Sequence, residues 1–98
     1  MANKVVYNSD FGGFGLSELA KEYLLRNYGL TEADINKLPR HDPRLVRCVE
    51  ALGEQANDDY SKIVVKELKG NRYRIDEYDG WESVVEPDDI EWITINED

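Results

Sequence analysis

Three arginines and the chain's one histidine gather around the predicted start of a helix near residue 43. Arg40, Arg44 and Arg47 are spaced four and three residues apart, so they can share one side of that helix, with His41 among them. Guanidinium groups form forked hydrogen bonds to phosphate and carboxylate, and the helix N-terminus adds to the attraction for an anion. The spacing predicts an anion clamp. The alternative is that these arginines pair with acidic residues near the C-terminus, within the chain or in a second copy.

A glycine-rich loop with two phenylalanines follows the first predicted strand, over residues 8–15. Gly12 and Gly13 allow the backbone to approach another group closely or to adopt a positive φ. Phe11 and Phe14 can hold a flat ring between them, as aromatic side chains do for bases. The glycine spacing matches neither a Walker A loop nor a dinucleotide-binding fingerprint. The loop predicts a ligand-binding segment; the alternative is that the phenylalanines fill the core and the glycines only form a turn.

Residues typical of catalysis are scarce. His41 is the only histidine, which excludes a metal site built from several histidines. Cys48 lies beside an apolar helix stripe, where a cysteine usually packs rather than acts as a nucleophile. The sequence therefore predicts a protein that is not an enzyme, with no catalytic residue, no metal and no cofactor.

Negative charge is concentrated at the C-terminal end. The formal net charge is −9, and residues 76–98 hold ten acidic residues without a Lys or Arg. Such a chain is a poor general binder of nucleic acid, because neutralising phosphates needs clustered Lys and Arg. The charge indicates either a solvated, self-repelling surface or an acidic face that meets a basic partner, including a basic patch on a second copy.

Capping residues predict two main helices. Ser17 is a good N-cap for a helix that Gly29 ends, and Asp42 caps a second helix with Pro43 in its first turn. Thr31 caps a further short turn between them. Apolar side chains repeat at helical spacing in both helices: Leu16, Leu19, Ala20, Tyr23 and Leu24 in the first, and Leu45, Val46, Val49, Leu52 and Ala56 in the second.

Strands are predicted where the apolar period becomes alternating. The segments 62–68 and 72–78 are expected to pair as a hairpin, and Asp79–Gly80 marks a second tight turn. Residues 1–98 are thus predicted to be one α+β domain with the order β-α-α-β-β-β-β, its two main helices packed on one face of a mostly antiparallel sheet. The predicted strands are 4–7, 62–68, 72–78, 81–85 and 91–95.

The cellular setting follows from what the sequence lacks. One cysteine cannot form an intrachain disulfide, which favours a reducing cytosol. No apolar run approaches the roughly 20 residues that a membrane span needs, and the N-terminus has no signal-peptide layout. A small core with exposed tryptophans gains from a second subunit, so a homo-oligomer is expected.

Several short motifs resemble a known family. The pattern resembles that of a family of small, mostly uncharacterised proteins of bacteriophages and large DNA viruses, and it covers most of the chain. The resemblance implies a viral protein that acts in the host cytoplasm. The matching residues are Gly12–Ser17, Pro39–Arg40, Asp42–Pro43, Leu45–Val46, Val49–Glu50, Leu52–Gly53 and Ile75–Gly80.

Two functional hypotheses follow. The first is a viral anti-defence sponge, which sequesters a small phosphorylated ligand, a nucleotide-type immune signal of the host, without cleaving it. The analogy rests on shared parts, namely aromatic rings for a base and arginines for phosphates. The second is an acidic inhibitor that binds a host protein and imitates the charge of nucleic acid. The residues predicted to bind the ligand are Phe11, Gly12, Gly13, Phe14, Arg40, His41 and Arg44.

Overall fold

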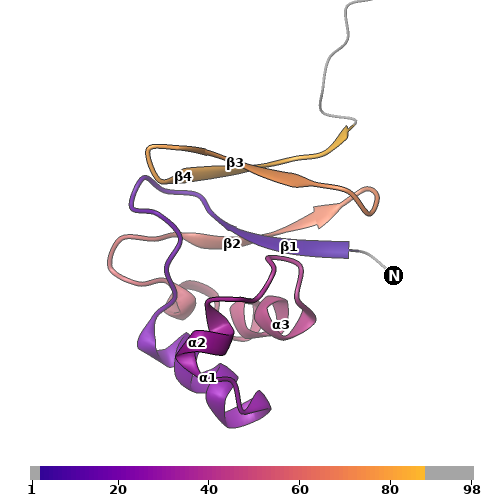
Figure 1. Cartoon of the computed structure of the whole chain (residues 1–98). Coiled ribbons are helices and arrows are strands. Elements are labelled where there is room, and N and C mark those ends of the chain that lie inside the picture. Colours follow the sequence, from indigo (N-terminus) through magenta and orange to yellow (C-terminus); the bar gives the residue numbers. More distant parts are fainter. Residues whose placement is uncertain (1–2, 88–98) are drawn as a thin grey trace, which may run out of the picture.

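The fold is α+β and stacks in three layers (Figure 1), in a computed structural model that describes residues 3–87. A pair of antiparallel strands, β1 and β2, lies between the helices on one side and a second antiparallel pair, β3 and β4, on the other. The fold class predicted from the sequence is confirmed. The elements are β1 (Asn3–Asn8), α1 (Glu18–Tyr28), α2 (Glu32–Ile35), α3 (Pro43–Leu52), the 3-10 helix η1 (Gly53–Ala56), β2 (Ile63–Leu68), β3 (Arg74–Tyr78) and β4 (Trp81–Val85).

Strand β1 is buried on both of its faces. Successive side chains of a strand point to opposite sides, so Val5 and Val6 face different layers. Both are fully buried: Val6 packs in the cluster beneath the helices, and Val5 packs with Leu68 and Val84 beneath the β3–β4 hairpin. The consecutive valines therefore indicate a strand that lies between two layers rather than a strand with one solvent-exposed face.

The predicted helix caps are confirmed. The Ser17 hydroxyl accepts a hydrogen bond from the Ala20 N–H at 3.1 Å, and Gly29 ends α1 in the left-handed region at φ 68°. Asp42 caps α3, with Pro43 at its first position. Thr31 and Asp34 form a capping box on α2.

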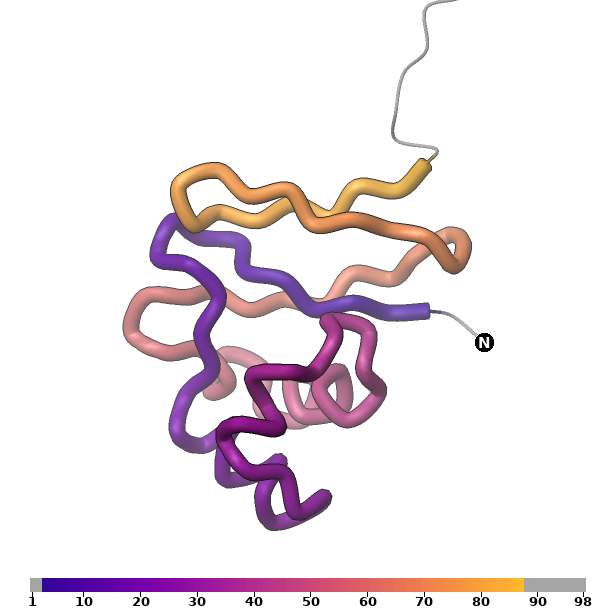
Figure 2. The backbone as a smooth tube through the Cα atoms, viewed as in Figure 1, coloured from indigo at the N-terminus to yellow at the C-terminus, as the bar shows by residue number. Residues whose placement is uncertain are grey.

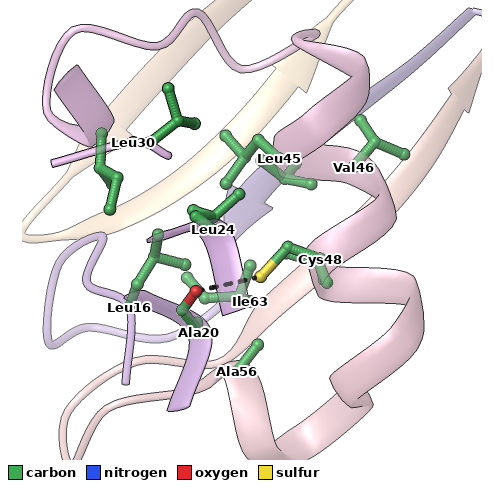
Figure 3. Close-up of a cluster of buried hydrophobic side chains, with 12 residues drawn as sticks. Leu16, Ala20, Leu24, Leu30, Leu45, Val46, Cys48, Ala56 and Ile63 are labelled. Carbon is green, nitrogen blue, oxygen red and sulfur yellow. Dashed lines mark hydrogen bonds between the residues drawn. The ribbon is translucent and has the colours of Figure 1, made fainter. Parts of the chain in front are cut away.

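The main core lies between the helices and β1–β2 (Figure 3). Leu24 of α1, Leu45 and Cys48 of α3, and Ile63 of β2 meet there, all buried. The prediction that Leu19 packs in the core is wrong, because Leu19 is 52% exposed. The first helix buries a narrower stripe than its apolar residues suggested.

The predicted hairpin between residues 62–68 and 72–78 is not formed. Strand β2 pairs instead with β1, with Val6 opposite Val65, and the chain then crosses to the other layer, where β3 pairs with β4 (Figure 2). Tight two-residue hairpins need positive φ in the turn. Asp79 and Gly80 supply it, with φ of 51° and 86°, whereas Gly70 does not adopt a positive φ.

Two further sequence predictions concern the ends of elements. Ala56 continues the second helix as predicted, but the turn that carries it is the 3-10 helix η1. The predicted strand 91–95 lies outside the described residues. Within residues 3–87, none of the helices is long and apolar enough to cross a membrane.

Candidate functional site

Three different pockets are lined by four of the seven predicted ligand-binding residues, namely Phe11, Phe14, Arg40 and His41. Phe14 and Arg40 line one of them, with a volume of about 240 Å³. Phe11 lines a second pocket, at the turn of the β3–β4 hairpin, and His41 lines a third, beside the start of α3. Of the predicted ligand-binding residues, Phe14 and Arg40 thus share a pocket, and the two phenylalanines face different pockets.

Arg40 is held inside the molecule by Glu82. Its two terminal nitrogens donate to the two carboxylate oxygens of Glu82 at 2.6 and 2.9 Å, and Glu82 is buried. The guanidinium carbon of Arg40 lies 3.6 Å from the centre of the Phe14 ring, which adds a cation–π contact. Arg40 therefore pairs with an acidic residue of the segment 76–98, which is the alternative that the sequence left open for these arginines.

Arg44 is also paired, with the residue that caps its own helix. Its Nε and Nη2 atoms donate to the carboxylate oxygens of Asp42 at 3.0 and 2.9 Å, and the Arg44 backbone N–H donates to Asp42 at 2.9 Å. The bond from Arg44 lowers the pKa of the Asp42 carboxyl below its ordinary value. A carboxylate of the chain thus occupies the helix N-terminus, where the sequence predicted a ligand's anionic group.

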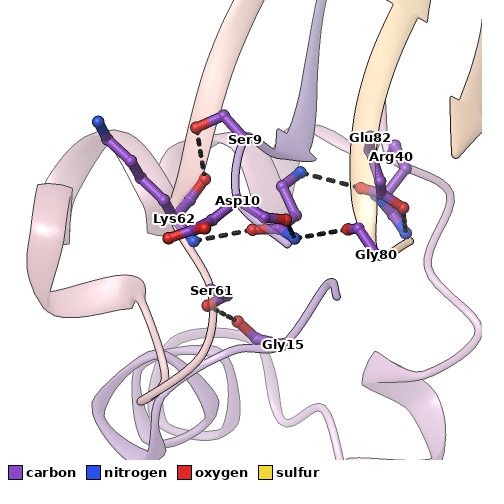
Figure 4. Close-up of polar contacts among 9 residues, drawn as sticks. Ser9, Asp10, Gly15, Arg40, Ser61, Lys62, Gly80 and Glu82 are labelled. Atoms are coloured by element: carbon purple, nitrogen blue, oxygen red, sulfur yellow. Dashed lines mark hydrogen bonds and ion pairs between the residues drawn. The ribbon is translucent and has the colours of Figure 1, made fainter. Parts of the chain in front are cut away.

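The Asn8 side chain joins three segments, which carry Asp10, Lys62 and Gly80 (labelled in Figure 4), and this role was not predicted from the sequence. Asn8 is fully buried at the end of β1, and its Nδ2 donates to the carbonyls of Asp10 at 2.6 Å and Gly80 at 2.8 Å. Its Oδ1 accepts from the Lys62 N–H at 2.8 Å, and its own N–H donates to Glu82 Oε1 at 2.9 Å. We call Asn8, Glu82 and Arg40 the Asn8 junction.

Besides the predicted alternative that Arg40 pairs with an acidic residue near the C-terminus, one sequence feature pointed toward this junction. A polar residue directly after the Val5-Val6-Tyr7 run shows that the strand ends there, but not that its side chain is buried. Glu82 carries no distinguishing signal, because it is one of ten acidic residues in the segment 76–98.

Glycines of the loop and of the β3–β4 turn allow parts of the chain to approach one another closely. A Cβ at Gly12 would lie 1.7 Å from the backbone oxygen of Tyr60, and a Cβ at Gly80 would lie 2.1 Å from the backbone oxygen of Phe11. Gly13 has a φ of 87°, which a side chain would strain. Both predicted properties, close approach and positive φ, are present. The group that approaches Gly12 is the 58–62 loop.

Aromatic side chains are exposed around the turn between β3 and β4. Phe11, Tyr78 and Trp81 are 55%, 80% and 40% exposed, and Phe11 meets Trp81 edge-to-face with ring centres 4.9 Å apart. Together with Asp76 and Glu77 they line a shallow pocket of about 400 Å³. We call these five residues the aromatic–acidic surface. Because exposed aromatic rings that lie next to one another can form a binding surface, this surface is a candidate contact site.

His41 and Cys48 have no catalytic partner in the part of the chain that the structure describes. His41 Nδ1 lies 2.7 Å from the Tyr73 hydroxyl oxygen. The centroids of the His41 and Tyr73 rings are 5.7 Å apart. Cys48 is fully buried, and burial raises the pKa of its thiol to about 11, so the thiol stays protonated and unreactive. No cluster of ligating side chains that would hold a metal ion occurs within residues 3–87.

No protein-family model, curated protein or solved structure matches this chain.

Proposed function

We propose that this protein is a non-catalytic binding protein whose aromatic–acidic surface holds a basic protein partner. The observation that carries the proposal is the exposure of Phe11, Tyr78 and Trp81 beside two carboxylates, Asp76 and Glu77. This proposal corresponds to the second of the two functions expected from the sequence, the acidic inhibitor, and it names the aromatic–acidic surface as the surface that binds.

Aromatic residues supply most of the binding energy at protein interfaces, because they bury a large area and lose few rotamers. Acidic neighbours select the partner by charge and speed its approach. A partner that fits this surface presents an apolar side chain flanked by Lys or Arg. The resemblance to small viral proteins makes a host protein in the cytoplasm the natural partner, and inhibition of an antiviral factor the natural effect.

Affinity capture from host-cell lysate tests the proposal with a matched pair of variants. Phe11→Ala combined with Tyr78→Ala removes the two most exposed aromatic rings of the surface. Leu25→Ala is the control, since Leu25 on α1 is 54% exposed, close to the 55% of Phe11, and lines no part of the aromatic–acidic surface. A protein retained by the wild type and the control, but not by the double variant, is then purified and titrated.

The proposal requires at least about a tenfold loss of affinity in the double variant, in line with alanine substitution of aromatic interface residues. Added salt should weaken the association further through Asp76 and Glu77. Equal capture by all three forms would contradict it. Self-association of the wild type that the double variant abolishes, measured by light scattering, would identify a second copy as the occupant instead.

A second candidate function is the expected sponge for a small phosphorylated ligand. The observation that favours it is the pocket shared by Phe14 and Arg40, which Lys21 also lines, so that a ring and two cations face one space. A phosphate there competes with Glu82 for Arg40 and with Glu32 for Lys21. That competition places this function behind the first.

Native mass spectrometry of protein purified gently from cells tests the sponge directly. A stoichiometric added mass that corresponds to a nucleotide, lost in Arg40→Gln, would support it. No added mass, together with no thermal shift from a panel of cyclic and linear nucleotides, would exclude it.

A further inference from the structure

The pocket beside His41 lies at the opposite end of β1 from the aromatic–acidic surface. The start of β1, the first turns of α3 and the segment that connects β2 to β3 enclose a volume of about 360 Å³. Three parts of the chain far apart in sequence thus build one concave site. Its lining includes Lys4, His41, Pro43, Arg47, Leu68 and Tyr73.

The positive charge of this pocket comes from one side chain. Lys4 donates to Glu50 at 2.8 Å, and this ion pair neutralises it within the pocket lining. Arg47 is exposed and makes no ion pair with any other residue in the range 3–87. Unlike Arg40 and Arg44, which are paired with Glu82 and Asp42, Arg47 keeps its full set of donors for a ligand.

A second hydrogen-bond donor is positioned on the same wall. Burial raises the pKa of the Tyr73 hydroxyl, which therefore stays protonated and can donate to His41 Nδ1 at 2.7 Å. When Nδ1 accepts this bond, Nε2 carries the ring's proton and can donate. Pro43, Val46 and Leu68 form an apolar part of the wall, and Asn3 and Asn71 complete the lining.

We propose that this pocket binds a carboxylate that carries an apolar group. One uncompensated guanidinium matches a singly charged, planar anion, which it holds through two parallel hydrogen bonds. The His41 ring donates to the same anion, and the apolar group packs on Pro43 and Leu68. Two sources share this chemistry, a free small acid and the C-terminal carboxylate of a peptide.

Amide NMR of the full chain tests the proposal with isocaproate as the probe. Isocaproate should shift the amides around Arg47, His41 and Asn71, whereas the uncharged isocaproamide should not. Acetyl-glycyl-leucine with a free or an amidated C-terminus distinguishes the two sources: tighter binding of the free-acid peptide than of isocaproate indicates a peptide terminus, and the reverse indicates a small acid.

Arg47→Gln should weaken isocaproate binding by about tenfold or more, the loss expected for a charge-assisted bidentate contact. Arg26→Gln is the control, because Arg26 is an exposed arginine of α1 that pairs with Glu22 and lines no part of this pocket. Absence of shifts at this pocket, equal shifts with isocaproamide, or equal affinity in Arg47→Gln would overturn the proposal. Inorganic phosphate that binds there more tightly than isocaproate would overturn the carboxylate assignment. None of these outcomes depends on the aromatic–acidic surface.

Discussion

The two sides of β1 are held by different kinds of interaction. Among residues 3–87, twelve buried residues form one cluster on the helix side, around Leu24 and Leu45, whereas on the hairpin side Val5, Leu68 and Val84 are buried together. Burial of apolar area scales with the number of side chains, so the helix side contributes most of the folding free energy. The hairpin side adds the buried polar contacts of the Asn8 junction.

This difference shows how a thin layer is positioned when little apolar area is available. Apolar contacts are not directional, and three buried residues allow a two-stranded hairpin to shift. Hydrogen bonds are directional, and buried ones are costly to leave unmade. The contacts of Asn8 and Glu82 therefore fix where β4 lies on β1, and with it the position of the aromatic–acidic surface.

The largest effect is expected on the helix side. Leu24→Ala removes a fully buried side chain from the centre of the main cluster and leaves a cavity. We expect a loss of about 2–5 kcal/mol in the free energy of unfolding, measured by urea denaturation. Leu25→Ala, one residue further along α1 but exposed, should change it by less than about 0.5 kcal/mol. Similar losses in both variants would contradict the assigned core.

The second-largest effect on stability is expected on the hairpin side of β1, and it distinguishes that layer from the helix side. Glu82→Gln removes the charge that faces Arg40, whose side chain is 24% exposed, and weakens the contact with the Asn8 N–H. We expect a loss of about 1–3 kcal/mol. Hydrogen exchange should rise in β3 and β4 before it rises in α1 and α3. Glu77→Gln, a change at an exposed position of the same hairpin, is the control and should leave the exchange pattern unaltered.

A smaller effect, on the helix side, depends on pH. The bond from Arg44 keeps the folded-state pKa of Asp42 below its ordinary value of 3.8. The stabilisation that the ionised Asp42 carboxylate contributes is therefore fully present at pH values above 3.8. It is lost as the pH falls through the lower folded pKa. Asp42→Asn keeps a capping oxygen but not the charge, so it should cost about 1 kcal/mol at neutral pH and nothing at low pH. A constant difference across this range, measured by thermal unfolding, would refute the pairing with Arg44.

The smallest effect on stability is expected at the aromatic–acidic surface. Tyr78→Ala removes a ring that is 80% exposed, so the free energy of unfolding should change by less than about 0.5 kcal/mol. A larger loss, seen in the same urea titration as Leu24→Ala, would show that the ring supports the hairpin. A negligible change, with the partner binding lost, would show that the ring is present for contact.

Local chemistry made the helices and the second hairpin predictable. Ser17, Gly29 and Asp42 act within one turn of their own helix, and Asp79–Gly80 supplies its own positive φ. Each of these signals depends only on residues a few positions away. The predictions that rested on them are confirmed.

Long-range contacts made the strand pairing and the site unpredictable. Ile63–Leu68 has an alternating pattern that suits any antiparallel partner, and only the packing of β1 between two layers selects β1 rather than β3. The arginines behave in the same way, because their spacing along the helix shows nothing about which carboxylate faces them. Arg40 is paired with a residue 42 positions away and Arg44 with one only two away, while Arg47 is left exposed without an ion pair in the described range.

The sequence by itself determined the α+β class, both helix caps, the loop glycines and the excess of acidic residues, because these follow from composition and short-range geometry. Only the tertiary structure decided that Asn8 is buried, that Glu82 holds Arg40 and that Phe11 meets Trp81. These contacts join segments that are far apart in the chain. They can stabilise the fold only when both layers are packed on β1.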